Sequence, residues 1–285
     1  MRILFIGDIV GKLGRSAVAQ FLPGLKQKEE IDFVVANAEN VTHGRGAKIE
    51  HLRELKQAGV DFFTSGDHIF YLDPTEPFSD PAVPVIRPAN LPEGTPGEGW
   101  KILESGGKKI AIINLLGWEF LGERLAEDNR NIWLKGEVEN PFPAVERLLK
   151  EISADLVFVD FHSELTSEKR AMGFFLDGRV TAVLGTHTHV PTADPEILPK
   201  GTGYISDIGM TGSRDSVLGV EPQIIISRLS AKGGKEGSAA PFEWVEKGPA
   251  VFRSVLIEIG KGNSVKRIMR MDSDLPTEAL AKVGV

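Results

Sequence analysis

Short apolar runs alternate with helical patterns along the first half of the chain. Runs rich in β-branched and aromatic residues predict buried strands at residues 2–6, 31–38 and 60–65. Between them, apolar residues recur at helical spacing, first at Val18, Phe21, Leu22 and Leu25 and then at Ile49, Leu52 and Leu55. Pro23 and Gly24 are expected to break or restart the first helix. This half therefore predicts consecutive units of a strand followed by a helix.

The second half is expected to hold fewer helices between its strands. A helix is predicted at 143–152, and strands are predicted at 108–115, 155–161 and 180–184. Further strand candidates follow at 203–206, 223–229, 251–259 and 265–271. Their close succession is more typical of hairpins than of strands joined by helices.

Two segments stand apart from this pattern. Residues 71–99 are rich in Pro, Gly and acids, hold one short strand candidate at 83–87, and are predicted to form an insertion or a lid. The composition of residues 231–240 predicts a flexible loop. Since no domain boundary is visible, we expect a single domain over residues 1–285.

Composition and charge remove several classes of function. The chain has no cysteine, which excludes disulfides, thiolate zinc sites and a cysteine nucleophile and agrees with the cytoplasmic location that we expect. No run approaches the ~20 apolar residues of a membrane-spanning helix, and the first apolar run is too short for a signal peptide. A net charge of -7 argues against stable binding to duplex nucleic acid, while a small phosphate ester held through metal ions stays compatible with it.

The first strand and the loop after it invite a nucleotide-binding interpretation, but the glycine spacing does not fit. Gly7 and Gly11 are too close for a P-loop, and Leu13 stands where Ser or Thr is required. The dinucleotide-binding glycine pattern is missing as well. What remains is an acid, Asp8, after a buried strand.

Metal-ligand residue types follow the predicted strands with unusual regularity. They are Asp8, Glu39, Asn40, Asp67, His68, His162, His187 and His189. Taken singly, each could be a helix cap, a turn residue or a core histidine. Together they include four of the six histidines, and ligands in α/β proteins bind at the carboxyl ends of strands. His187 and His189, two residues apart, are expected to point the same way from an extended backbone.

Mixed histidine and carboxylate ligands suit two divalent or trivalent metal ions, with Fe or Mn favoured and Zn as a further candidate. Two ions about 3.5–4 Å apart clamp the attacking and leaving oxygens of a phosphoryl transfer and acidify a bridging water. Glu39 is the candidate for a carboxylate between the ions, and His68 could protonate the leaving oxygen.

At these positions the chain resembles a known family. Gly7-Asp8, Gly66-Asp67-His68 and the run from Gly185 to His189 are similar to the signatures of calcineurin-like metallophosphoesterases. Further matches point to the YmdB-like branch; they lie at residues 7–11, 37–40, 87–90, 161–164, 166–169, 185–192 and 207–210. The resemblance implies an α/β/β/α sandwich of two mixed sheets flanked by helices. It also implies hydrolysis of cyclic nucleotides and related phosphodiesters at a dinuclear site, and self-association.

The resemblance also assigns roles. Asp8, Glu39 and His189 would hold the first metal, and Glu39 would bridge to a second metal held by Asp67, His162 and His187. Asn40 would lie against the first metal or the phosphate, and His68 would be the general acid. Asn90 either lines the substrate site or is an ordinary turn residue. Glu164 and Asp207 are candidates to orient histidines, and Lys169 is a candidate to lie near the phosphate.

Asp67 departs from the family pattern, which has Asn between the glycine and the histidine. A carboxylate there would make the second metal a weaker Lewis acid and would favour a protonated His68. Either the activity falls or the metal preference moves toward a harder cation.

The leading hypothesis is a metal-dependent phosphodiesterase acting on 2',3'- or 3',5'-cyclic nucleotides through a metal-bridging hydroxide. Two alternatives stay open. One is a regulatory protein that binds metal and nucleotide with weak or no turnover. The other is a phosphomonoesterase or nuclease on the same scaffold, of which the acidic composition disfavours the nuclease.

Overall fold

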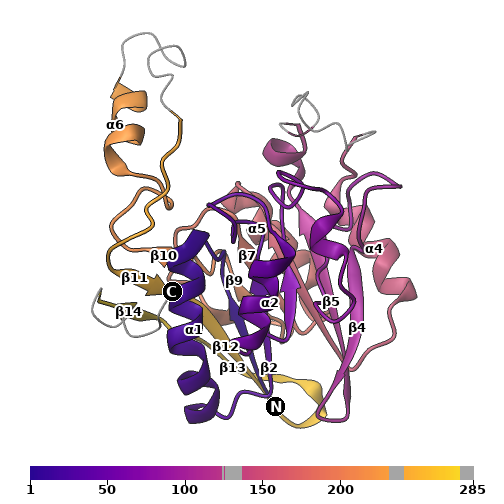
Figure 1. Ribbon diagram of the computed structural model, residues 1–285. Coiled ribbons are helices and arrows are strands. Elements are labelled where there is room, and N and C mark those ends of the chain that lie inside the picture. Colours follow the sequence, from indigo (N-terminus) through magenta and orange to yellow (C-terminus); the bar gives the residue numbers. More distant parts are fainter. Residues whose placement is uncertain (124, 126–136, 231–240, 277–285) are drawn as a thin grey trace.

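Two large mixed sheets lie face to face in the computed structural model, which describes residues 1–123, 125, 137–230 and 241–276 (Figure 1). One apolar core fills the space between the sheets. A second core lies between the first sheet and helices α1 (Gly11–Lys28) and α2 (Ile49–Gln57), and a third lies between the second sheet and helices α4 (Pro141–Glu151) and α5 (Thr166–Leu176). The four-layer sandwich implied by the family resemblance is confirmed.

The first sheet is built on parallel strands that bury both faces. In order across the sheet, its strands are β13 (Val265–Arg270), β12 (Ser254–Ile259), β1 (Arg2–Ile6), β2 (Phe33–Asn37) and β3 (Phe62–Thr64). β1, β2 and β3 are parallel, so their carboxyl ends share one edge, and β12 joins β1 antiparallel. The apolar runs read from the sequence become these strands because their two faces pack on two different cores.

The second sheet has the same plan at its centre. Its strands, in order, are β4 (Trp100–Ser105), β5 (Lys108–Leu116), β6 (Leu156–His162), β7 (Ala182–Thr186), β9 (Gly203–Ile205) and β8 (Glu196–Ile197). β5, β6, β7 and β9 are parallel, while the edge strands β4 and β8 are antiparallel to their neighbours.

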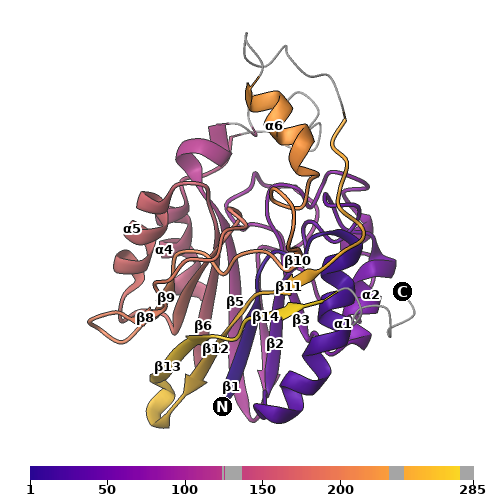
Figure 2. The same ribbon diagram turned by 90° about the vertical axis from the view of Figure 1, so that its left-hand side faces the viewer.

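The remaining elements are small. A third sheet consists of β10 (Gly212–Ser213), β11 (Ala250–Phe252) and β14 (Ser273–Leu275). Short helical turns cover Glu76–Phe78, Trp118–Gly122 and Lys261–Asn263. Helix α6 (Pro222–Ser230) stands away from both large sheets and has no buried residue (Figure 2). No helix within the described residues is long and apolar enough to cross a bilayer.

Helix α1 corrects the expected break at Pro23 and Gly24, because it continues through both residues. Both lie on the solvent face, where water can satisfy the carbonyl that a proline leaves without its helical partner. On the opposite face Val18, Leu22 and Leu25 are buried, and burying such side chains contributes about 1.5–3 kcal/mol each. The buried face therefore outweighs the proline.

The strand predicted at 223–229 is wrong, since this segment lies in helix α6. Three consecutive isoleucines favour a strand by propensity, but they pair with no strand here. Pro222 occupies the first position of the helix, where its fixed φ and missing N–H suit a helix start.

Two further strand predictions need correction. The candidate at 251–259 is two strands in two sheets, interrupted at Arg253, whose backbone bonds to Gly7 and to the Thr211 side chain. The candidate at 83–87 makes only two isolated bridges, through Val85 and Ile86. A strand is interrupted wherever its backbone groups find partners outside a continuous ladder.

Strand β4 was missed by the sequence analysis, although a signal was present. Gly106 and Gly107 both have positive φ and form the two-residue turn of a hairpin that joins β4 to β5. β4 is an edge strand and half-buried, so its apolar pattern is weak.

Residues 71–99 connect the two large sheets. Ile86 is fully buried in the core between the sheets, so this part of the segment belongs to the sandwich. That other parts of it form a lid stays a prediction. The loop predicted at 231–240 lies outside the described residues.

Candidate metal centre

The carboxyl ends of five parallel strands bring the predicted ligands to one place. They are Asp8 after β1, Glu39 and Asn40 after β2, Asp67 and His68 after β3, His162 at the end of β6, and His187 and His189 after β7. Because both sheets present these ends at the same edge, residues far apart in the sequence come within hydrogen-bonding distance of one another.

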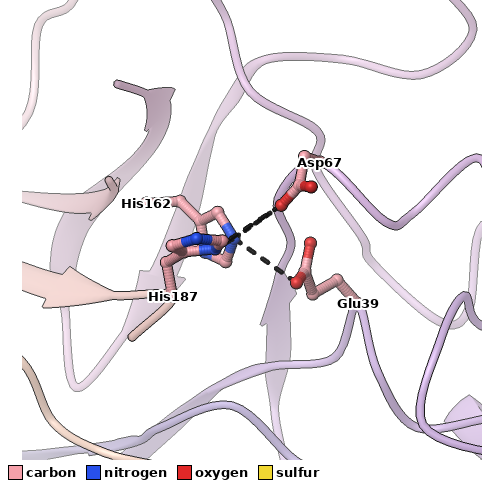
Figure 3. Close-up of side chains that lie close together, drawn as sticks. All are labelled: Glu39, Asp67, His162 and His187. Atoms are coloured by element: carbon pink, nitrogen blue, oxygen red, sulfur yellow. Dashed lines mark hydrogen bonds and ion pairs between the residues drawn. The ribbon is translucent and has the colours of Figure 1, made fainter. Parts of the chain in front are cut away.

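Four of these residues form a group that we call the compact cluster: Glu39, Asp67, His162 and His187. One ligand atom of each lies within 4.8 Å of those of the other three. At its centre, His162 Nε2 is 3.2 Å from Asp67 Oδ1, 3.3 Å from Glu39 Oε1 and 3.1 Å from His187 Nδ1. Figure 3 shows the two imidazoles facing the two carboxylates.

Three of the other four residues form what we call the loose group: Asp8, Asn40 and His189. His189 Nε2 is 3.9 Å from Asp8 Oδ1 and 3.4 Å from Asn40 Nδ2. Within the described part of the chain, Asp8 Oδ1, Asn40 Oδ1 and His189 Nδ1 are buried atoms that have no hydrogen-bond partner. Glu39 adjoins both groups, because its Oε1 accepts a hydrogen bond from Asn40 Nδ2 at 2.8 Å.

These observations fit metal ions in two respects. Ligands about 2.1 Å from a common ion lie about 3–4 Å apart, close to the separations in the compact cluster. The buried atoms of the loose group would otherwise be desolvated without compensation, which metal coordination provides. Gly66 keeps the space open: a Cβ there would lie 2.3 Å from His162 Nε2 and 2.4 Å from Glu39 Oε2.

Hydrogen bonds orient the two imidazoles of the compact cluster. Thr186 Oγ1 donates to Asp160 Oδ1 at 2.6 Å and is 2.9 Å from His162 Nδ1. Since the hydroxyl proton points to Asp160, Thr186 accepts from Nδ1–H, so Nε2 is the atom that would bind a metal after losing its own proton. On the other ring, His187 Nε2 is 3.0 Å from Glu164 Oε2, which favours a lone pair on Nδ1. Glu164 thus contacts the histidine that it was expected to orient.

The backbone after β7 differs from the sequence expectation. His187 and His189 do not continue an extended strand but have φ values of 98° and 64°. Residues other than glycine rarely occupy this region, and each such residue costs of order 1–3 kcal/mol. His187 serves the compact cluster and His189 the loose group because of this loop conformation, in which the backbone N–H of His187 donates to Asp8 Oδ2 at 3.2 Å.

Charges in the compact cluster are mutually compensating. Burial raises the pKa of Glu39, but the adjacent imidazoles of His162 and His68 lower it by a larger amount. The pKa therefore lies well below its ordinary value. Burial lowers the pKa of His162, and Glu39 and Asp67 outweigh this effect and raise the pKa well above its ordinary value. Despite burial, the pKa of Asp67 is lowered by His68, His162 and His187. In the absence of a metal ion, protons on imidazole balance the carboxylates.

The loose group lacks this compensation. Burial raises the pKa of Asp8 to about 6; the charge of His162 opposes this rise but is outweighed by burial together with the negative charges of Asp207 and Glu39. Burial lowers the pKa of His189 to about 4, so its imidazole is neutral at pH 7. A neutral imidazole and an ionised but poorly solvated carboxylate are ligands ready for a cation.

His68 lies beside the compact cluster and is partly exposed to the pocket. Its Nδ1 is 3.2 Å from Glu39 Oε1 and its Nε2 is 3.5 Å from Asp67 Oδ2. Burial lowers the pKa of His68, but Asp67 and Glu39 raise it above its ordinary value. The two carboxylates thus favour the protonated ring, which can donate its proton.

Asn90 is not brought to this centre. Its side chain is fully buried and bonds to backbone groups, donating to the carbonyls of Leu116 and Glu139 and accepting from the N–H of Leu116. These bonds fix the loop beside β5. The sequence interpretation as an ordinary loop residue agrees with this geometry.

Lys169 and Asp207 also differ from their expected positions. Lys169 is 1% exposed and donates to Asp207 Oδ2 at 2.6 Å, so the lysine is engaged in a buried ion pair. Asp207 accepts from the backbone N–H and the hydroxyl of Thr188, at 3.1 and 2.8 Å. It holds the loop between the two histidines rather than either imidazole.

A pocket of about 310 Å³ opens above the centre. Its polar floor includes Glu39, Asn40, His68, His187 and His189. Of its other lining residues, only Glu164 was a candidate in the sequence analysis. The sequence analysis missed the rest, which are Arg45, Thr188, Val217, Leu218, Val220, Ile225, Phe242 and Trp244. The apolar lining residues, at 217–225 and 242–244, follow β10 in the sequence, and no periodic pattern links them to the ligands.

Comparison with known proteins gives consistent matches over nearly the whole chain. The profile of the family described as YmdB-like protein matches residues 4–271. A 2',3'-cyclic-nucleotide 2'-phosphodiesterase of Bacillus subtilis (strain 168) is 40% identical over 281 residues, which are 96% of this chain and 99% of that protein.

Solved structures agree with the sequence matches. The crystal structure of a novel phosphatase from Mycoplasma pneumoniae has a TM-score of 0.84 at 34% identity and covers 99% of this chain and 96% of its own. A 5'-nucleotidase precursor from Thermus thermophilus has a TM-score of 0.56 at 12% identity over 98% of this chain and 55% of its own. The second similarity shows the fold alone.

Proposed function

Because this chain belongs to the YmdB-like protein family, we propose that it hydrolyses small phosphodiesters, above all cyclic nucleotides, at a centre of two metal ions. The Bacillus relative is named for a 2',3'-cyclic substrate, which favours 2',3'- over 3',5'-cyclic nucleotides. The observation that carries the proposal is the convergence of the compact cluster and the loose group at the floor of one pocket.

The ligands divide between the two ions in this proposal. Asp67, His162 and His187 would hold one ion, Asp8, Asn40 and His189 would hold the other, and Glu39 would contribute to both. Nitrogen and carboxylate donors favour Fe or Mn, with Zn as a further candidate. When bound, the ions supply Lewis acidity toward the phosphoryl oxygens and lower the pKa of the attacking water.

His68 completes the reaction as general acid. Hydrolysis adds water across one P–O ester bond, and the leaving oxygen takes up a proton as that bond breaks. His68 borders the pocket, and the neighbouring carboxylates raise its pKa and favour the protonated ring, so it can supply this proton. A proton released by the attacking water restores the imidazolium for the next turnover.

The test is hydrolysis of 2',3'-cyclic AMP by protein loaded with Fe, Mn or Zn, beside a metal analysis of the same sample. We expect two ions per chain and turnover. A sample that retains two ions and hydrolyses no phosphodiester would remove the proposal. Rates on a phosphodiester and the matching monoester, measured side by side, separate the diesterase from a phosphomonoesterase, and a single-stranded oligonucleotide tests the nuclease.

Asp67 supports one alternative, a regulatory protein that binds metal and nucleotide with weak turnover. Its carboxylate joins Asp8 and Glu39 in the centre and would reduce the Lewis acidity of the ion that it holds. Asp67→Asn distinguishes the two functions. A gain in kcat well above tenfold favours the regulatory protein, and an unchanged or lower kcat favours a fully active enzyme. A cytoplasmic location and self-association stay predictions.

A further inference from the structure

The pocket above the metal centre has two ends of different chemistry. The floor is made of charged and polar ligands, whereas the opposite wall contains Val217, Leu218, Val220, Ile225, Phe242 and Trp244. In this wall, as far as the structure describes it, the indole N–H of Trp244 is the only side-chain group able to hydrogen-bond. A ligand that spans the pocket therefore needs a charged end and an apolar, flat or compact end.

The apolar wall is fixed relative to the metal ligands. Val245 N–H donates to Gly219 O and Glu221 N–H to Glu243 O, both at 2.9 Å, which ties the two sides of the wall together. The Trp244 indole lies directly on Gly44, where a Cβ would come within 2.1 Å of Trp244 Cδ2. Gly44 has a φ of 77° and lies four residues after Asn40, so the wall rests on the loop that carries two ligands.

Arg45 lines the pocket beside Phe242 of the wall, and its charge acts on His68 of the floor. Its guanidinium carbon is 5.0 Å from the ring centroid of Phe242 and 5.6 Å from that of Tyr71, distances typical of cation–π contacts. Among the described residues, its Nε is a buried donor with no hydrogen-bond partner. A half-buried guanidinium whose buried Nε–H has no acceptor is suited to hydrogen-bond an anionic ligand.

We propose that this wall binds the base of a nucleotide whose phosphate lies at the metal centre, and that Arg45 donates a hydrogen bond to the sugar–phosphate part between them. This inference rests on the proposed function and adds to it the residues that bind the base and the sugar–phosphate part of the substrate. A volume of about 310 Å³ suits a single nucleotide, at the lower end of ligand pockets of about 300–1,000 Å³.

The chemistry of the wall also determines selectivity among bases. Apolar contact rewards buried area and reads no hydrogen-bond pattern, so a larger purine should bind more tightly than a pyrimidine without strict discrimination. A phosphate ester that lacks a base should lose the contribution of the wall and keep that of the metal centre.

The test is calorimetric binding of adenosine 3'-phosphate, cytidine 3'-phosphate and ribose 5-phosphate to the metal-loaded protein. Phe242→Ala is the main variant. Phe174→Ala is its matched control, because Phe174 is also a half-exposed ring under a guanidinium, with Arg170 at 4.5 Å, but does not line the pocket. Leu218→Asn is a second wall variant, chosen because Leu218 is exposed and Asn tolerates its φ of 53°.

We expect Phe242→Ala to weaken the binding of adenosine 3'-phosphate about 5- to 50-fold, as for loss of one base contact. The affinity for ribose 5-phosphate should stay within twofold of that of the parent. Leu218→Asn should weaken the binding of adenosine 3'-phosphate by a few-fold, and Phe174→Ala should leave the affinity for both ligands unchanged. Equal losses for both ligands, or no loss with either wall variant, would overturn the inference. Because binding needs no turnover, a failure to hydrolyse cyclic nucleotides would remove the proposed function while these affinities still decide the base site.

Discussion

The compact cluster and the loose group are built from the same residue types at the same edge, yet they solve the problem of buried charge differently. In the compact cluster, imidazoles and carboxylates touch, and a proton on His162 balances Glu39 and Asp67. In the loose group, as far as the described residues show, Asp8 and His189 keep buried atoms without partners. The polar groups of a site can thus be satisfied by one another or can require a metal ion. The contact distances in the two groups differ by less than one ångström.

The largest expected effect is a loss of activity that should be the same for a ligand of either group. His162→Ala and His189→Ala should each lower kcat/KM roughly a thousandfold, because each removes a ligand from a centre whose ions supply several kcal/mol to the transition state. Steady-state rates and bound metal per chain measure this. His51→Ala is the control, since His51 bonds to Thr42 away from the centre. Either ligand variant keeping two ions and a rate within tenfold of the parent would contradict the assignment.

Removal of the general acid should depend on the leaving group. His68→Asn is expected to lower kcat about 10²- to 10³-fold for a cyclic nucleotide, whose alkoxide leaving group needs a proton. For an aryl diester with a nitrophenolate leaving group, the loss should stay below about tenfold. The ratio of the two rates is the measurement. A loss of the same size for both substrates would assign His68 to binding or metal support instead.

Matched carboxamide variants sharpen the comparison, because they should change stability in opposite directions. The pKa of Asp8 is raised from 3.8 to about 6, so the folded protein binds the extra proton and loses stability as pH rises through this window. Asp8→Asn should therefore stabilise the metal-free protein at pH 7 by about 1–3 kcal/mol.

Asp67 has the opposite sign. Its pKa is lowered, so the carboxylate contributes stability above its ordinary pKa of 3.8 that is lost as pH falls. Asp67→Asn should destabilise the metal-free protein at pH 7 by about 1–3 kcal/mol. Urea unfolding in chelator at pH 7 measures both variants. Shifts of the same sign would show that the two groups do not differ in charge compensation.

The smallest effect is proton release on metal binding. At pH 7 the raised pKa of His162 keeps a proton that a metal must displace, whereas His189, with a pKa of about 4, has none to lose. We expect about one proton released per chain, nearly all of it from the compact cluster. Calorimetry in two buffers of different ionisation enthalpy counts it. Asp8→Asn should leave the count unchanged at pH 7, and a lower count would place the proton in the loose group.

The site was more predictable than parts of the fold because a simple rule applies to it. Asp8, Glu39 and His162 could be placed together since the carboxyl ends of parallel strands meet at one edge. Helix α6 was predicted as a strand from the β propensity of its isoleucines. Because the helix has no buried face, no packing pattern was present to correct this prediction. Asn90 was ambiguous, since its role depends on carbonyls more than 25 positions away.

The apolar wall of the pocket could not be predicted from any local pattern of the sequence. Trp244 contacts Gly44, and the two residues are separated by most of the chain. Contacts of this kind depend on how the small third sheet positions the segment after β10, which no periodicity of the sequence encodes. The Gly44-Arg45-Gly46 sequence is typical of a turn but does not identify the side chain that packs on it.

In the proposed dinuclear centre, the loop that holds His187 and His189 would make the two metal ions thermodynamically dependent on each other. Both histidines adopt left-handed backbone conformations within three residues. An ion that captures His187 also holds His189 in place, so the second ion binds to a loop already ordered. Linkage requires the effect to be reciprocal, and a coupling of about 1–3 kcal/mol corresponds to a 5- to 150-fold gain in affinity. Metal loading should therefore be cooperative, with few molecules carrying a single ion.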